Sequence, residues 1–147
     1  MSDVQLERSL NWHLAWPADN GPFQTPMVET ICLALQKPMR DLNAREVRLL
    51  ISQDIAREYA VPLALELLKS DPFVFGGIDR GDLLEACLRL EPVFWAINFR
   101  TFSQFREFLS GLRTIDRNIN TRIEAFLKLE IEPPVRIRKL KKSKGRR

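Results

Sequence analysis

Apolar residues recur three and four positions apart through most of the chain, most regularly between residues 43 and 90. Three sets show this spacing: Val47, Leu50 and Ile51; Tyr59, Leu63 and Leu67; and Leu84, Cys87 and Leu88. Because a helical turn takes about 3.6 residues, each set falls on one side of a helix. The pattern predicts three helices with buried faces and few polar side chains left over for chemistry.

Capping signals mark where these and other helices begin. Thr25-Pro26 is typical of a helix start, and Asn43 with Glu46 forms a capping-box pattern. Gln53-Asp54 marks a break before the next helix, in which Pro62 is expected in the first turn or at a kink. Further on, Asp79 is predicted to cap a helix over residues 80–90. Thr101 with Gln104 gives a second capping-box pattern.

After that pattern, an apolar stripe continues from Phe105 to Leu127. It predicts a long helix over residues 103–130, which Gly111 could divide and Pro133-Pro134 ends. No internal repeat or convincing strand pattern is present in the sequence. The predicted fold is therefore all-α: a compact single-domain bundle of about five to seven helices over residues 1–135, with a long C-terminal helix.

Composition is typical of a globular protein, with 45% hydrophobic and 29% charged residues in 147. No apolar run approaches the ~20 residues of a membrane-spanning helix, and the N-terminus lacks signal-peptide order, so we expect a cytoplasmic protein without a membrane partner. Trp12 and Trp16 are expected to pack back onto the body. Cys32 and Cys87 are expected to be reduced core residues.

Charge divides the chain unevenly. Residues 136–147 carry eight of the 23 basic side chains and no acidic one, which leaves 15 basic against 19 acidic residues in the remainder. The body is thus mildly acidic, and the basic tail is expected to be disordered, either as a solubilising end or as a weak, non-specific contact with nucleic acid.

Motifs of catalysis are missing from the sequence. It contains no P-loop, no His-x-x-x-His, no Cys-x-x-Cys and no Gly-x-Ser-x-Gly, and its single histidine, His13, has no visible partner. Carboxylates at helical spacing, such as Asp54 with Glu58, are usually solvated faces. We therefore predict a binding protein rather than an enzyme, with no catalytic residue, metal, cofactor or small-molecule substrate.

Five short motifs, in order, carry a family resemblance over residues 9–95. They are Lys37-Pro38, Val47-Arg-Leu-Leu-Ile-Ser-Gln53, Val61-Pro-Leu-Ala-Leu-Glu66, Asp71-Pro72 and Gly81-Asp-Leu-Leu84. In this set the chain resembles the immunity proteins of bacterial contact-dependent growth inhibition systems. It departs from the pattern at Ser52, where glycine is usual, and at residues 77–80, where a run like Asp-Phe-Tyr-Pro is common.

The resemblance implies an antitoxin that binds the C-terminal domain of a cognate toxin, which could be a nuclease, and covers its active site or substrate surface. Such a protein works in the cytoplasm of the cell that makes the toxin. An acidic body would suit a basic nuclease. The alternative function is a nucleic-acid-associated helical protein that uses the basic tail.

Two sets of residues follow from these interpretations. The structural signature, expected to be mainly scaffold, comprises Pro38, Arg48, Leu50, Gln53, Pro62, Leu65, Pro72, Gly81, Asp82 and Leu84. The candidates for toxin binding are the acidic residues Asp54, Glu58, Asp79 and Glu85.

Overall fold

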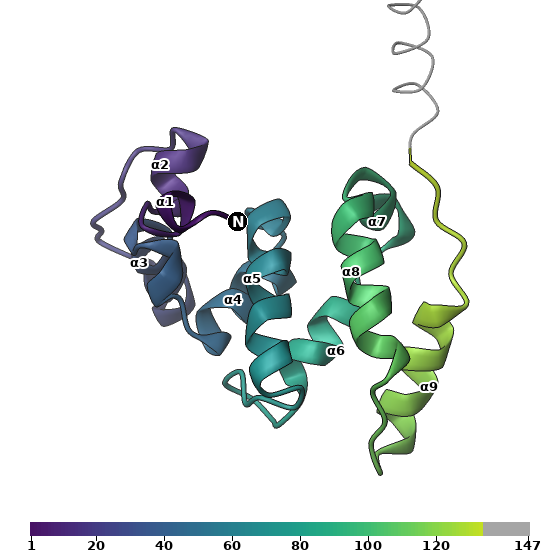
Figure 1. The fold of residues 1–147 in the computed structure, drawn as a ribbon. Coiled ribbons are helices and arrows are strands. Elements are labelled where there is room, and N and C mark those ends of the chain that lie inside the picture. The colour runs from purple at the N-terminus through teal and green to yellow at the C-terminus, as the bar shows by residue number, and fades with distance from the viewer. Residues whose placement is uncertain (134–147) are drawn as a thin grey trace, which may run out of the picture. The chain divides into compact units, whose positions relative to one another are not determined.

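The computed structural model describes residues 1–133 and is helical throughout (Figure 1). The described residues form nine α-helices and one 3-10 helix, η1, and contain no strand. The all-α prediction is confirmed, but the helix count of five to seven is too low, because α1, α2, α6 and α7 are helices of four to seven residues that a pattern search merges or misses.

Contacts within the chain divide it into two compact units, Met1–Cys87 and the residues from Leu88 onward. We describe each unit by itself. One domain over residues 1–135 stays a prediction, and the basic tail, residues 136–147, lies outside the described residues.

Two short helices open the first unit. Ser2 caps α1 (Asp3–Leu6) and Ser9 caps α2 (Leu10–Leu14). Trp12 lies in α2 and is 60% exposed, and Trp16 is 43% exposed, so the expectation that both pack onto the body is wrong. The physical reason is that α2 has only five residues and buries one of them, Leu10.

His13 of α2 packs against neighbouring residues of the first unit. Its Nε2 atom lies 2.8 Å from the carbonyl oxygen of Gln5, and its ring stacks on Tyr59 with centroids 5.4 Å apart. These contacts join α1 and α2 to the start of the helix that carries Tyr59.

The next helices begin where the caps predict. Thr25 caps α3 (Pro26–Gln36), which ends before Pro38 and the short η1 (Met39–Asp41). Asn43 and Glu46 form the expected capping box of α4 (Ala44–Ser52). Glu46 is also buried, and its Oε2 atom forms an ion pair with Lys37 Nζ at 2.9 Å. The same carboxylate therefore takes part in both the capping box and an ion pair.

The core of the first unit lies between α4 and α5 (Arg57–Ser70), which pack against each other (Figure 1). Leu50 of α4 and Leu68 of α5 are fully buried, and Leu65 is nearly so. The predicted break is present, since Asp54 and Ala56 both have positive φ. Pro62 is the sixth residue of α5, so of the two positions predicted for it the first turn is wrong, and a kink stays a prediction.

The first unit ends within α6 (Asp82–Leu88), at Cys87. This helix starts two residues later than predicted, and Asp79 does not cap it, because the chain turns through Gly81 at φ +87° immediately before the helix. Cys87 is buried in α6, and burial raises the pKa of its thiol. Both cysteines are free, but Cys32 is only half-buried, so its predicted core position is wrong.

The second unit contains α7 (Pro92–Ile97), α8 (Phe99–Ser110) and α9 (Arg117–Leu127). Trp95 is fully buried at its centre, with the rings of Phe102, Phe105 and Phe126 at centroid distances of 5.8, 5.5 and 5.3 Å. Aromatic rings at such separations attract one another in addition to burying apolar area.

The predicted long helix over residues 103–130 is wrong, and the division at Gly111 is confirmed. Gly111 is the C-cap of α8, and Asp116 restarts the helix by accepting hydrogen bonds from the amides of Asn118 and Ile119. The capping box at Thr101 is likewise wrong, because α8 already begins at Phe99. Ile115, between the two helices, is fully exposed.

Candidate functional site

Eleven residues connect α5 to α6, and we call this segment the 71–81 loop. Its start is fixed by Asp71, whose Oδ1 accepts a hydrogen bond from the Phe73 amide at 3.1 Å. Its ends meet where the Gly81 amide donates to the carbonyl oxygens of Phe73 and Val74. Within it, Phe75 and Arg80 form an isolated antiparallel bridge, which closes a tight turn that we call the loop tip, residues 75–80.

The Asp82 carboxylate accepts hydrogen bonds from backbone amides of the loop tip. Its Oδ1 accepts from the Gly76 amide at 2.6 Å, and its Oδ2 accepts from the amides of Ile78 and Asp79 at 2.9 and 3.3 Å. A single carboxylate thus satisfies three backbone donors of the loop tip that no helix or sheet would otherwise satisfy.

Arg48 of α4 completes this network. Its Nε donates to the Gly76 carbonyl oxygen at 2.5 Å and lies 3.4 Å from Asp82 Oδ2. The side chains of Arg48 and Asp82 are only 12% and 9% exposed. A buried ion pair contributes little net stability, but loss of one partner is costly, so such a pair is best understood as fixing a geometry.

Two glycines of the loop are required by its shape. Gly77 has φ +107°, a conformation that side chains disfavour. At Gly76, a Cβ atom would lie 2.5 Å from Asp82 Oδ1, so any other residue would displace the carboxylate. Both glycines therefore have a specific function in the loop.

The loop tip presents apolar side chains to solvent. Phe75 is 57% exposed and Ile78 is 64% exposed. The next two residues, Asp79 and Arg80, are exposed. Arg80 Nη2 lies 3.7 Å from Asp71 Oδ1. Hydrogen bonds to Asp82 and Arg48 hold the backbone of the loop tip, while the side chains of Phe75 and Ile78 remain exposed.

The structure gives the signature residues three different environments. Arg48, Gly81 and Asp82 meet at the 71–81 loop, whereas Leu50, Leu65 and Leu84 are core residues. The remaining four lie at element boundaries or on half-buried or exposed positions: Pro38, Gln53, Pro62 and Pro72. Sequence reasoning placed Arg48 and Asp82 on helices but missed their contact, because nothing in a single sequence pairs residues 34 positions apart.

The four predicted toxin-binding residues do not form one patch. Asp54 and Glu58 lie at the start of α5 and are exposed, and Asp54 pairs with Arg57 Nε at 3.1 Å. Asp79 and the half-buried Glu85 follow the other end of α5. Because α5 has 14 residues, its ends are separated by about 21 Å.

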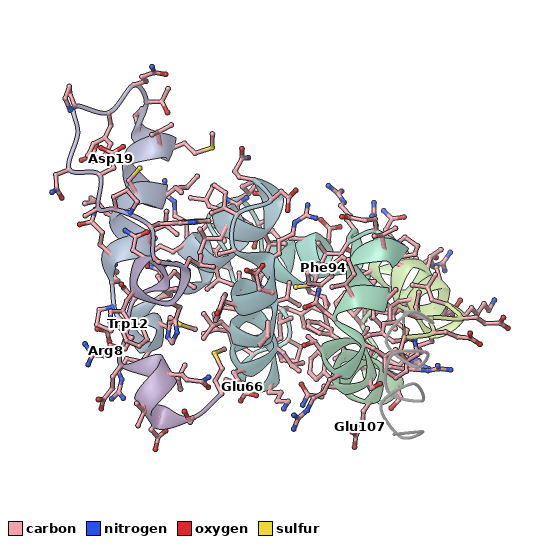
Figure 2. All side chains as sticks on the ribbon, turned by 90° about the horizontal axis from the view of Figure 1, so that it is seen from above. Arg8, Trp12, Asp19, Glu66, Phe94 and Glu107 are labelled. Carbon is pink, nitrogen blue, oxygen red and sulfur yellow. The ribbon has the colours of Figure 1, made fainter. Side chains whose placement is uncertain are left out.

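A second exposed group, absent from the sequence-based candidates, lies at α2. The Arg8 guanidinium sits 5.0 Å from the centre of the Trp12 ring, and Figure 2 shows the two side chains together at the edge of the first unit. Tryptophan and arginine are common at protein interfaces. Exposed tryptophan is hard to foresee, since the sequence favours its burial.

Within residues 1–133, no group of three or more His, Cys, Asp or Glu side chains is placed to hold a metal ion. No helix in the same range is long and apolar enough to cross a membrane.

Comparison with known proteins gives a family. No curated protein and no solved structure matches the chain significantly. A family model described as CDI immunity proteins, where CDI is contact-dependent growth inhibition, matches residues 13–105. That match extends from α2 into α8, includes the 71–81 loop and covers more than half of the sequence, so the chain belongs to the family of CDI immunity proteins.

Proposed function

We propose that this protein neutralises its cognate toxin by binding the toxin's C-terminal domain and covering its active site or substrate surface. The observation that carries the proposal is the family match over residues 13–105, since CDI immunity proteins neutralise CDI toxins. The protein then acts as a stoichiometric inhibitor in the cytoplasm of the cell that makes the toxin, with no reaction of its own.

The surface of the described residues supports binding rather than catalysis. Its exposed features include an apolar loop tip held by internal hydrogen bonds and an arginine–tryptophan pair, both of which suit a protein partner. The acidic excess of four charges over residues 1–135 favours encounter with a basic partner such as a nuclease.

The test uses the C-terminal domain of the toxin encoded next to this gene. Induction of that domain in a cell should stop growth, and co-expression of this protein should restore it. The purified pair, with a catalytically inactive toxin domain, should form a complex of fixed stoichiometry by size-exclusion chromatography with light scattering. Growth arrest that persists at equal expression, with no complex in vitro, would refute the proposal.

The basic residues 136–147 favour a second candidate, association with nucleic acid. A chain ending at Glu132 separates the two functions, because every described helix ends by Leu127 and is kept. We expect that chain to fold, to bind the toxin domain as the full chain does, and to lose affinity for duplex DNA at low salt. Tight DNA binding without any toxin binding by the full chain would favour the second candidate instead.

A further inference from the structure

We propose that the loop tip, residues 75–80, is the part of this protein that enters the toxin, with Phe75 and Ile78 as apolar anchors and Asp79 as the charged contact. The inference rests on the proposed function and adds the surface and the complementary chemistry: an apolar recess on the toxin domain bordered by a lysine or arginine.

The first argument is preorganisation. Three amides of the loop tip donate to Asp82, the Gly76 carbonyl accepts from Arg48, and the Phe75–Arg80 bridge closes the turn. A segment that is already ordered loses little conformational freedom when a partner binds, so more of its contact energy appears as affinity.

The second argument is the exposure of the anchors. Phe75 and Ile78 remain 57% and 64% exposed although their backbone is fixed by polar contacts beneath it. Burial of these two side chains therefore does not explain the loop conformation. It presents two large apolar side chains within one six-residue turn, and interface cores are built from such side chains.

The third argument is charge. Two acids of this region have partners in the fold, because Asp82 pairs with Arg48 and Asp71 lies 3.7 Å from Arg80. For the exposed carboxylate of Asp79, no ion pair forms within the described part of the chain. This acid, next to Ile78, is thus available to a basic side chain of the partner, as electrostatic complementarity requires.

The decisive variant is Phe75→Ala with Ile78→Ala, tested against the inactive toxin domain by calorimetry or biolayer interferometry. The matched control is Val93→Ala with Ile97→Ala, which removes an apolar pair of similar exposure, 66% and 69%, from α7. We expect the loop variant to bind at least about 30-fold more weakly, as loss of an interface hot spot does, and the control to stay within about threefold of the wild type.

A measurement on the unaltered protein removes any dependence on how the variant folds. Hydrogen exchange in the segment 74–80 should slow on addition of the inactive toxin domain. Charge reversal by Asp79→Lys should lower the association rate, more at low than at high salt.

The outcomes distinguish the two proposals. Wild-type protein that neither protects nor binds refutes the proposed function and this inference together. Wild-type protein that binds, with the loop variant within about threefold of it and segment 74–80 unprotected, refutes this inference alone. Loss of binding in Trp12→Ala without loss in the loop variant assigns the contact to α2 and also overturns it.

Discussion

Asp82→Asn tests whether the 71–81 loop is held by one carboxylate. The substitution keeps the size of the side chain and one acceptor oxygen, but it removes the charge and turns the other oxygen into a donor. If the remaining oxygen still accepts the hydrogen bond from the Gly76 amide, the new NH2 group faces the amides of Ile78 and Asp79. In the wild type these two amides donate to Asp82 Oδ2 at 2.9 and 3.3 Å. The Arg48 guanidinium, 12% exposed, loses its counter-charge.

The magnitude follows from these contacts. Removal of one partner from a buried ion pair costs about 3–5 kcal/mol. Because asparagine retains one acceptor, we expect Asp82→Asn to lower the free energy of unfolding by about 2–4 kcal/mol. Neither side chain is more than an eighth exposed, so solvent screening reduces the cost little.

The assay is urea unfolding followed by far-UV circular dichroism, with Asp79→Asn as the matched control. Asp79 lies in the same loop, is exposed, and contributes only backbone groups to the network. Its substitution should change the free energy of unfolding by no more than about 0.5 kcal/mol. Equal and small effects of the two substitutions would show that the carboxylate network does not stabilise the loop.

A reciprocal variant checks the same contact from the other helix. Arg48→Met leaves the Asp82 carboxylate buried without its cation, whereas Arg45→Met alters an exposed arginine of the same helix. The effects of Arg48→Met and Asp82→Asn should be strongly non-additive, because either substitution alone breaks the pair. Additive effects would mean that the two residues act independently.

Three further predictions concern the core, the acidic surface and the thiols. Leu50→Ala should lower the free energy of unfolding by about 2–5 kcal/mol through lost burial and a cavity, and loss of toxin binding at an unchanged melting temperature would contradict a scaffold role. Asp54→Asn, which suits the positive φ of that residue, combined with Glu58→Lys should weaken toxin binding at low salt, and an affinity within error of the wild type removes both from the binding surface. At pH 8, burial and the raised pKa of its thiol should keep Cys87 from reacting with Ellman's reagent in the folded protein. Cys32 alone should then react, and slowly because the pKa of its thiol is also raised, until guanidinium exposes both thiols. Rapid reaction of two thiols without denaturant would disprove this.

Local signals in the sequence predicted the starts of α3 and α4 correctly, but not those of α6 and α8. Thr25, Asn43 and Glu46 act at their predicted positions because a cap involves side chains and amides only two or three residues apart. The all-α class followed from the same short-range periodicity. The capping signal failed at Thr101, because this residue lies inside α8, which already begins at Phe99.

Long-range packing decided the rest. The sequence identified Arg48 and Asp82 as family positions, yet only the tertiary structure shows that they meet and hold the loop tip. Likewise, only the tertiary structure shows that the apolar side chains of Phe75 and Ile78 are exposed to solvent. The physical reason is that periodicity specifies which side of a helix is apolar, whereas the partner of a loop and the exposure of its side chains depend on segments distant in the chain.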